Sequence, residues 1–314
     1  MQPSHFQKCD WDSTASEYSK LPKDGPLLVP CKRLLGAMHG TLSFASATTI
    51  IDIGCGPGTA VSFLIDGYGH DIPPQSRVIA TDYSTGMVEV TRSRVETERT
   101  SGKENAKCWG QVETMELDAQ DLSAFPSSSA SHIMGSLVYF MLPDPQKGLR
   151  EAYRVLRAGG VFACTSWARV QWMQFMDQAA QEVRRAAGSE SVSILCWVST
   201  IFKDELIDMV GGGKHSTGMR FFPKQWGDVA GVKGELESAG FRDVHSEYID
   251  FDWLVEDPEA FAETMCKSSN PGTKMLLGDL SDEKLDRVVE SYTRIVKEHG
   301  NVCKGVAVLG IGTK

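Results

Sequence analysis

The chain has 314 residues, of which 41% are hydrophobic and 23% are charged, and its formal net charge is -9. This composition is typical of a globular protein large enough for one domain with a full core, or for a domain with a sizeable insertion. A nucleic-acid binder usually carries a basic stripe, and this acidic chain has no basic run. The chain also lacks an apolar run of roughly 18 residues, and its polar N-terminus lacks the order of a signal peptide. We therefore expect no nucleic-acid partner and no membrane span.

The eight cysteines are scattered along the chain without a Cys-x-x-Cys pair. This spacing argues against both a zinc site and a disulfide scaffold, so we expect no metal. Most of the cysteines stand beside apolar residues, which is typical of small buried hydrophobes in a reducing compartment. The expected location is the cytoplasm.

In chain order, residues 1–45 are predicted to form a helical flap, with strand and helix signals alternating after it. Five short runs rich in β-branched and apolar residues predict strands at 48–53, 77–82, 112–117, 132–137 and 161–166. Helix-like spacing separates several of them, and the helix predicted for 145–156 is expected to stop at Gly159-Gly160. An alternating order of strands and helices predicts a parallel sheet with helices on both faces, which binds ligands at the carboxyl ends of its strands.

The second half of the chain changes character at residue 169. Residues 169–226 show helical spacing without a strand signal, so we expect a helical lid inserted after a core of residues 46–168. Residues 227–314 would complete the core with two further strands, at 244–251 and 305–311, separated by helices. The predicted fold is α/β: a single domain of 314 residues with a doubly wound, mostly parallel seven-stranded Rossmann-like sheet.

The glycine-rich turn after the first strand is the strongest functional signal. It has the pattern Gly54-x-Gly56-x-Gly58 and lies between a predicted strand and a predicted helix, where backbone N–H groups can approach a ligand. A dinucleotide-binding loop has the form G-x-G-x-x-G, and the position of its third glycine is Thr59 here. The spacing therefore weakens the hypotheses of a nicotinamide or flavin cofactor.

Two acids accompany the turn. Asp82 ends the second strand, where a carboxylate can accept hydrogen bonds from both hydroxyls of a ribose. Asp52 lies beside the turn, and a carboxylate there suits the ammonium group of S-adenosylmethionine (SAM) better than a pyrophosphate, which it would repel. Close glycines alone could form only a tight turn, and Asp82 alone could only cap a helix. Their combined order at strand ends favours a cofactor site.

Taken together, the sequence resembles the class I SAM-dependent methyltransferases, in particular the small-molecule branch typified by ubiquinone and menaquinone biosynthesis. The overall style is similar to that of fungal methyltransferases of secondary metabolism. Five segments are similar to motifs of the family and occur in its order: residues 11–18, 51–58, 80–87, 118–122 and 154–160.

The resemblance implies SAM as the cofactor and assigns roles to individual residues. Tyr18 would close over the cofactor and Met87 would pack on the adenine. Asp118 would accept a hydrogen bond from the adenine amine, and the next backbone N–H, of Ala119, would meet the ring. The expected SAM site comprises Tyr18, Asp52, Gly54, Gly56, Gly58, Asp82, Met87, Asp118, Ala119 and Ser136.

Several apolar residues follow the fourth and fifth strands, and as a group they fit a pocket for a hydrophobic, aromatic or cyclic small-molecule acceptor. Aromatic residues at helical spacing are as often plain core, so the two interpretations compete for each of them. The candidate acceptor contacts are Tyr139, Trp167, Trp172, Met173 and Trp226.

Methyl transfer is an in-line displacement, to which alignment of the reactants can contribute on the order of 7–11 kcal/mol. A hydroxyl or carbon acceptor would also need a base. His215 could face the pocket or could equally be an exposed loop residue, and His132 and His245 are predicted to be structural. Many relatives carry a histidine after the fourth strand, where this chain has residues 137–140 without one. No catalytic base is assigned, and the sequence indicates neither the attacking atom (O, N, S or C) nor the oligomeric state.

Three functional hypotheses remain open from the sequence. The favoured one is a SAM-dependent methyltransferase acting on a hydrophobic small molecule in secondary metabolism. The second is a SAM-binding protein that does not methylate, either a regulatory partner or a fold recruited for cyclisation. The third is an NAD-dependent oxidoreductase, which the loop spacing disfavours.

Overall fold

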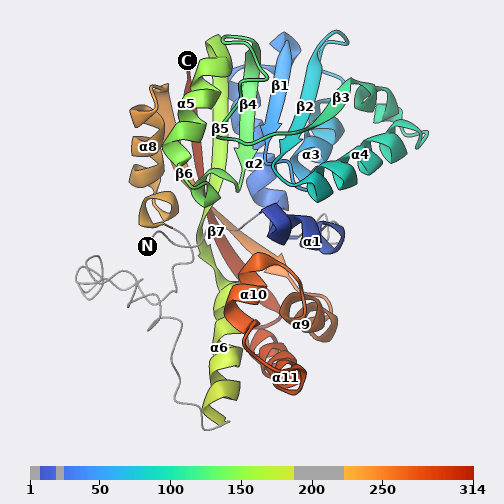
Figure 1. Cartoon of the computed structure of the whole chain (residues 1–314), viewed down its shortest axis with the longest axis vertical. Coiled ribbons are helices and arrows are strands. Elements are labelled where there is room, and N and C mark those ends of the chain that lie inside the picture. Colours follow the sequence, from blue (N-terminus) through green and yellow to red (C-terminus); the bar gives the residue numbers. More distant parts are fainter. Residues whose placement is uncertain (1–7, 19–24, 187–222) are drawn as a thin grey trace. The chain divides into compact units, whose positions relative to one another are not determined.

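The computed structural model describes residues 8–18, 25–186 and 223–314, which divide into two compact units (Figure 1). Among the described residues, the larger unit contains 8–18, 25–168, 223–251 and 306–314, and the smaller contains 169–186 and 252–305. Among the described helices, none combines the length and the apolar character needed to cross a membrane.

The strands form one seven-stranded sheet in the order β3-β2-β1-β4-β5-β7-β6. Strand β1 pairs in parallel with both β2 and β4, β2 pairs in parallel with β3, and β4 does so with β5. The chain therefore reverses its direction of travel across the sheet between β1 and β4, which is the position where such sheets bind ligands. The predicted fold class is confirmed. The strands are β1 Thr49–Ile53, β2 Arg77–Asp82, β3 Val112–Glu116, β4 Ala130–Ser136, β5 Leu156–Val170, β6 Arg242–Leu254 and β7 Val302–Thr313.

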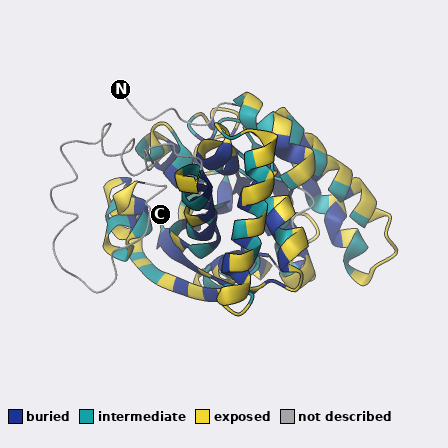
Figure 2. Ribbon diagram, turned by 90° about the horizontal axis from the view of Figure 1, so that it is seen from below, coloured by how far each residue is buried: buried dark blue, intermediate teal, exposed yellow. Residues whose placement is uncertain are grey.

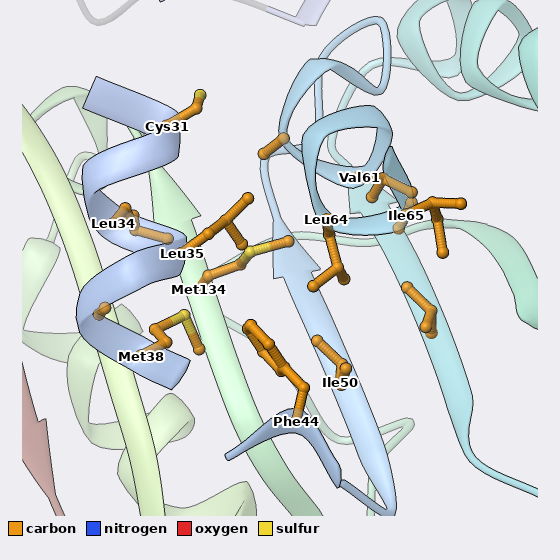
Figure 3. Close-up of a cluster of buried hydrophobic side chains, with 14 of the residues drawn as sticks. Cys31, Leu34, Leu35, Met38, Phe44, Ile50, Val61, Leu64, Ile65 and Met134 are labelled. Atoms are coloured by element: carbon orange, nitrogen blue, oxygen red, sulfur yellow. The ribbon is translucent and has the colours of Figure 1, made fainter. Parts of the chain in front are cut away.

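The central strands are apolar on both faces because helices cover both sides of the sheet. Successive residues of a strand point to opposite faces, so Ile50 packs into one core cluster and Ile51 into the other. Figure 3 shows the first cluster, where Leu35 of helix α2 (Leu28–Thr41) lies beside Met134, and Phe44 lies between Met38 and Ile50. Buried side chains on helices α3 (Thr59–Tyr68) and α4 (Thr85–Arg99) join the same cluster.

The second cluster lies on the other face of the sheet. It contains side chains of α5 (Pro145–Val155) and α8 (Val229–Ser238). Each helix is capped by the aspartate that precedes it, Asp144 for α5 and Asp228 for α8, whose side chain accepts a hydrogen bond from a backbone N–H of the first turn. Helix α1 (Lys8–Tyr18) comes before all of these elements in the sequence. Short 3-10 helices complete this unit: Phe44–Ser46, Glu104–Gln111, Tyr139–Met141 and Lys224–Gly227.

The boundary between α5 and β5 differs from the prediction. The helix ends at Val155, and β5 begins at the next residue and continues through Gly159 and Gly160 instead of starting after them. The pairing of β4 with β5 shifts register in this region, and Gly159 has a φ of +69°. The Gly159 N–H donates to the carbonyl of Lys314 at 2.9 Å, and the Lys314 N–H donates to the carbonyl of Gly160 at 3.1 Å. The two glycines thus form an irregular strand segment that pairs with the chain end.

The smaller unit is mainly helical, with α6 Gln171–Ala186, α9 Pro258–Cys266, α10 Pro271–Leu277 and α11 Asp282–Glu298. The buried residues of α11 recur at helical spacing, as the alternation of colours along the helices in Figure 2 illustrates. Tyr292 of α11 donates a hydrogen bond to the carbonyl of Trp172 at 3.0 Å, and the Trp172 ring meets Trp253 edge to face. Residues 252–305 therefore group mainly with α6, while the two ends of this segment belong to the sheet strands β6 and β7.

Candidate functional site

A pocket of about 260 Å³ lies at the carboxyl ends of β1, β2 and β4, within the larger unit. Of the ten residues expected to bind SAM, only Gly58 is missing from the described residues that line the pocket. The remaining lining residues belong to α1, to the segment before and within α2, to the start of α3, and to the loops that follow β1, β2, β3 and β4: Trp11, Leu27, Cys31, Cys55, Pro57, Thr59, Ala60, Tyr83, Leu117, Gln120, Leu137, Val138, Met141, Leu142 and Pro143.

Each glycine of the turn after β1 has a positive φ, which disfavours a side chain. A Cβ at Gly54 would lie 2.5 Å from Cγ2 of Val138, so the backbone here approaches the loop after β4 too closely for any other residue. Gly58 caps helix α3, and a Cβ there would meet Thr91 of α4 at 3.0 Å. Gly58 thus allows the loop to lie close to Thr91, and it is not among the residues that line the pocket. Gly56 has free space around its Cα, and Thr91 Oγ1 donates to its carbonyl at 2.7 Å.

Asp82 supports this loop as well as lining the pocket. One carboxylate oxygen accepts a hydrogen bond from the Gly56 N–H at 2.8 Å, and the other accepts from the Ser84 N–H at 2.8 Å. Burial raises the pKa of Asp82, while these two N–H donors act in the opposite direction. The sequence placed Asp82 at the end of β2, but it gave no sign that this side chain holds the glycine loop.

Asp52 is the unusual group of the pocket. Its side chain is buried, and neither carboxylate oxygen has a hydrogen-bond partner among the described residues. Burial, and after it the nearby charge of Asp82, raises the pKa of Asp52 well above its usual value. An unpartnered buried carboxyl is costly unless a ligand supplies donors or positive charge. The residues present therefore fit a ligand with a cationic donor, such as the ammonium group of SAM.

The remaining predicted residues surround these two acids. Asp118 lies after β3, where its Oδ1 accepts a hydrogen bond from the Gln120 N–H at 2.8 Å, and Ala119 beside it is buried. Met87 is buried in the first turn of α4. On α1, Tyr18 packs edge to face against the ring of Trp11, and burial raises the pKa of Tyr18 to about 12.

One wall of the pocket was not anticipated from the sequence. Cys31 of α2 forms a hydrogen bond with Ser136 at 3.3 Å, and Ser136 forms another with Thr165 of β5 at 3.2 Å. Burial raises the pKa of Cys31 to about 12, so its side chain is a neutral thiol. The next residue, Leu137, has a φ of +61° and donates its N–H to the Thr165 carbonyl at 3.1 Å. A cysteine or a leucine carries no local signal for such a place, which depends on contacts distant in sequence.

Comparison with known proteins identifies the pocket-bearing region. Residues 51–164 match the family described as methyltransferase domain. Methyltransferase ucsB of Acremonium sp is 28% identical over 97% of this chain and 95% of its own length. Methyltransferase tpcH of Aspergillus fumigatus is 26% identical over 84% of each chain, and methyltransferase ktnA of Aspergillus niger is 22% identical over 79% of this chain and 77% of its own. Residues 51–164 thus carry a methyltransferase domain, and most of the chain is similar to fungal methyltransferases.

The five residues predicted to contact the methyl acceptor do not line the described pocket of this methyltransferase. Tyr139 is fully buried, with its ring edge to face against Phe162, and its hydroxyl has no partner among the described residues. Trp226 is also fully buried, and its carbonyl accepts a hydrogen bond from Ser166. Trp167 is partly buried and packs against Phe251.

The other two acceptor candidates lie on α6 of the smaller unit. Trp172 is buried there, and the side chain of Met173 lies close to Gly272 of α10. His215 lies outside the described residues. In the larger unit, His132 is buried and hydrogen-bonds to the carbonyl of Leu42 at 2.9 Å, which agrees with the structural role predicted for it.

Proposed function

We propose that this methyltransferase transfers the methyl group of SAM to a hydrophobic small molecule of secondary metabolism. The single observation that carries the choice of cofactor site is the buried, unpartnered carboxyl of Asp52 beside the glycine loop. The fungal methyltransferases that match most of the chain support the assignment to secondary metabolism. Apolar residues after β4, among them Leu137, Val138 and Met141, support a hydrophobic acceptor.

In this proposal the two acids bind different parts of the cofactor. Asp52 accepts hydrogen bonds from the ammonium group, which neutralises its charge in a buried place. Asp82 accepts from the ribose hydroxyls. Each of its oxygens already accepts one N–H bond, and a carboxylate oxygen has a second lone pair available for a ligand hydroxyl.

The adenine is assigned to the side of the pocket between β2 and β3. Met87 packs against the ring, Asp118 accepts from its amine, and the Ala119 N–H donates to the ring. Tyr18 covers the cofactor and Ser136 bounds the methionine end. The turn at Asp118, fixed by its hydrogen bond to the Gln120 N–H, supports this assignment because it presents both groups from one short segment.

SAM supplies an activated sulfonium methyl group, so the chain has to bind, align and exclude water. Burial raises the pKa of Tyr18 and of Cys31 to about 12 in each case, which keeps both groups protonated and makes them poor bases at neutral pH. We assign cofactor binding to the larger unit. We also propose that the inserted segment 169–226, of which the structure describes residues 169–186 and 223–226, contributes to acceptor selection. The free cysteines of the described chain support our placement of the enzyme in the cytoplasm.

Calorimetric titration with SAM tests the assignment of the site. Asp82→Ala removes a ligand acceptor and the support of the Gly56 N–H, so SAM affinity should fall by about 1–3 kcal/mol. Glu113→Gln is the matched control, because Glu113 is an exposed acid of the neighbouring strand β3 that pairs with Arg77. Equal affinity of wild type and Asp82→Ala would contradict the proposed site.

Incubation with methyl-labelled SAM and a panel of hydrophobic acceptors tests the reaction itself. We expect label to appear in at least one hydrophobic acceptor, and expect it to appear more slowly with Asp82→Ala at SAM concentrations below the dissociation constant of this variant. Tight SAM binding without transfer to any acceptor would contradict methyl transfer.

A further inference from the structure

Helix α1 and the glycine loop are joined by a chain of hydrogen bonds that passes through Ser84. The Ser84 hydroxyl donates to Asp12 Oδ1 of α1 at 2.6 Å and accepts from the Met87 N–H at 3.1 Å. The Ser84 N–H donates to Asp82, whose other oxygen accepts from the Gly56 N–H. Ser84, the central link of this chain of hydrogen bonds, is fully buried and so is shielded from competing water.

Asp12 also completes the N-terminus of helix α4 from a different segment of the chain. Its Oδ1 accepts a second hydrogen bond, from the Gly86 N–H at 3.0 Å. The first N–H groups of a helix have no partner within the helix, and negative charge is favourable there. Burial raises the pKa of Asp12, but the bonds from Ser84 and Gly86 outweigh this effect and the pKa is lowered, so Asp12 is a carboxylate at neutral pH.

Close packing reinforces these bonds. A Cβ at Gly86 would lie 3.0 Å from the carbonyl oxygen of Asp12 and 3.1 Å from Cβ of Ala15, so the backbone of α1 rests directly on the first turn of α4. A second attachment, between Lys8 and Glu116, is exposed, with 32% and 48% of the two side chains accessible, and should contribute little. Of these two polar attachments of α1, the one through Asp12 is therefore the stronger.

We propose that Asp12 is a positioning residue that latches α1 onto the cofactor pocket, so that docking of α1 and binding of SAM stabilise each other. The latch acts at both ends of the hydrogen-bond chain. On α1 it fixes the helix that carries Trp11 and Tyr18 to the pocket wall, and through Ser84 it orders Met87 and Asp82. This inference rests on the proposed binding of SAM in this pocket. Coupling between two events is reciprocal, which makes it measurable from either side.

The test combines SAM titration calorimetry with amide hydrogen exchange of residues 8–18 in the full chain. In the wild type, SAM should slow exchange in α1. Asp12→Ala should raise the dissociation constant for SAM at least tenfold and should speed exchange in α1 without changing exchange in β1 and β4. Asp12→Asn retains an acceptor oxygen and should raise the dissociation constant by less than Asp12→Ala does. Glu116→Gln, which breaks the exposed pair, should stay within twofold of the wild type.

Gly86→Ala provides a second variant with Asp12 intact, because the added methyl group would push α1 away from α4. Gly86→Ala should also weaken SAM binding and speed exchange in α1. If Asp12→Ala does not fold, Gly86→Ala serves as the test of the proposed latch. The latch is overturned if wild-type α1 exchanges equally fast with and without SAM, or if folded Asp12→Ala binds SAM as the wild type does. Failure of the wild type to bind SAM at all would instead refute the proposed function.

Discussion

Proton release on SAM binding follows from the environment of Asp52. Because burial and then Asp82 raise the pKa of this carboxyl, it tends to hold a proton in the free protein. An ammonium group bound beside it would favour the carboxylate, so SAM binding should expel this proton. Asp52→Asn removes the titrating group while nearly keeping its shape, and it should abolish the release.

The size of the pH effect on SAM binding follows from the linkage between proton release and ligand binding. At pH values below the pKa of Asp52 in the free protein, the dissociation constant for SAM should fall by up to tenfold for each unit that the pH rises, which is about 1.4 kcal/mol per unit. Without SAM, Asp52 makes the folding stability change with pH in the direction opposite to that of an ordinary acid, whose pKa is lowered by folding. The folded-state pKa is above the unfolded value, so stability is greatest below the unfolded pKa and falls as pH rises towards the folded one.

Calorimetry in buffers of different ionisation enthalpy measures the proton count directly, and repetition between about pH 5 and pH 8 measures the slope. The wild type and the control Glu113→Gln should release up to one proton, and Asp52→Asn should release none. The reasoning would be refuted if the wild type bound SAM without releasing a proton, or if Asp52→Asn showed the same pH dependence as the wild type.

Three further outcomes are expected. Gly54→Ala should cost about 1–3 kcal/mol of stability and weaken SAM binding, because the methyl group would lie 2.5 Å from Val138 at a φ of +65°. Gly56→Ala should reduce the stability by less, because its methyl group would enter free space. Denaturant unfolding of the two variants checks this. Burial lowers the pKa of His132 to about 4, so the free energy of unfolding should fall by about 3 kcal/mol as pH drops from 6.5 to 4, and a His132→Gln variant that lost as much would contradict this cause. Tyr139→Phe removes a buried hydroxyl without a described partner, so thermal unfolding should show equal or greater stability; a drop in methyl transfer with unchanged SAM affinity would instead support the acceptor contact predicted from the sequence.

Local signals explain why the sheet and the cofactor could be predicted. The β-branched runs that became β1 and β2 are buried on both faces, and such runs are recognisable without tertiary information. The Gly54-x-Gly56-x-Gly58 pattern was equally legible, because all three residues have positive φ values that other residues rarely adopt. The predicted fold class is confirmed, and the methyltransferase domain of residues 51–164 agrees with the predicted cofactor SAM.

The sequence by itself therefore determined the order of elements, the loop after β1 and the acids that face the pocket, since each depends on residues close together in the chain. Tertiary packing decided the rest. It brought Asp12 to Ser84 and Val138 to Gly54, and it buried Tyr139 within the core, where the sequence suggested an acceptor contact. These placements depend on which side chains meet across long stretches of chain, and an apolar or capping residue has the same local signature in either place.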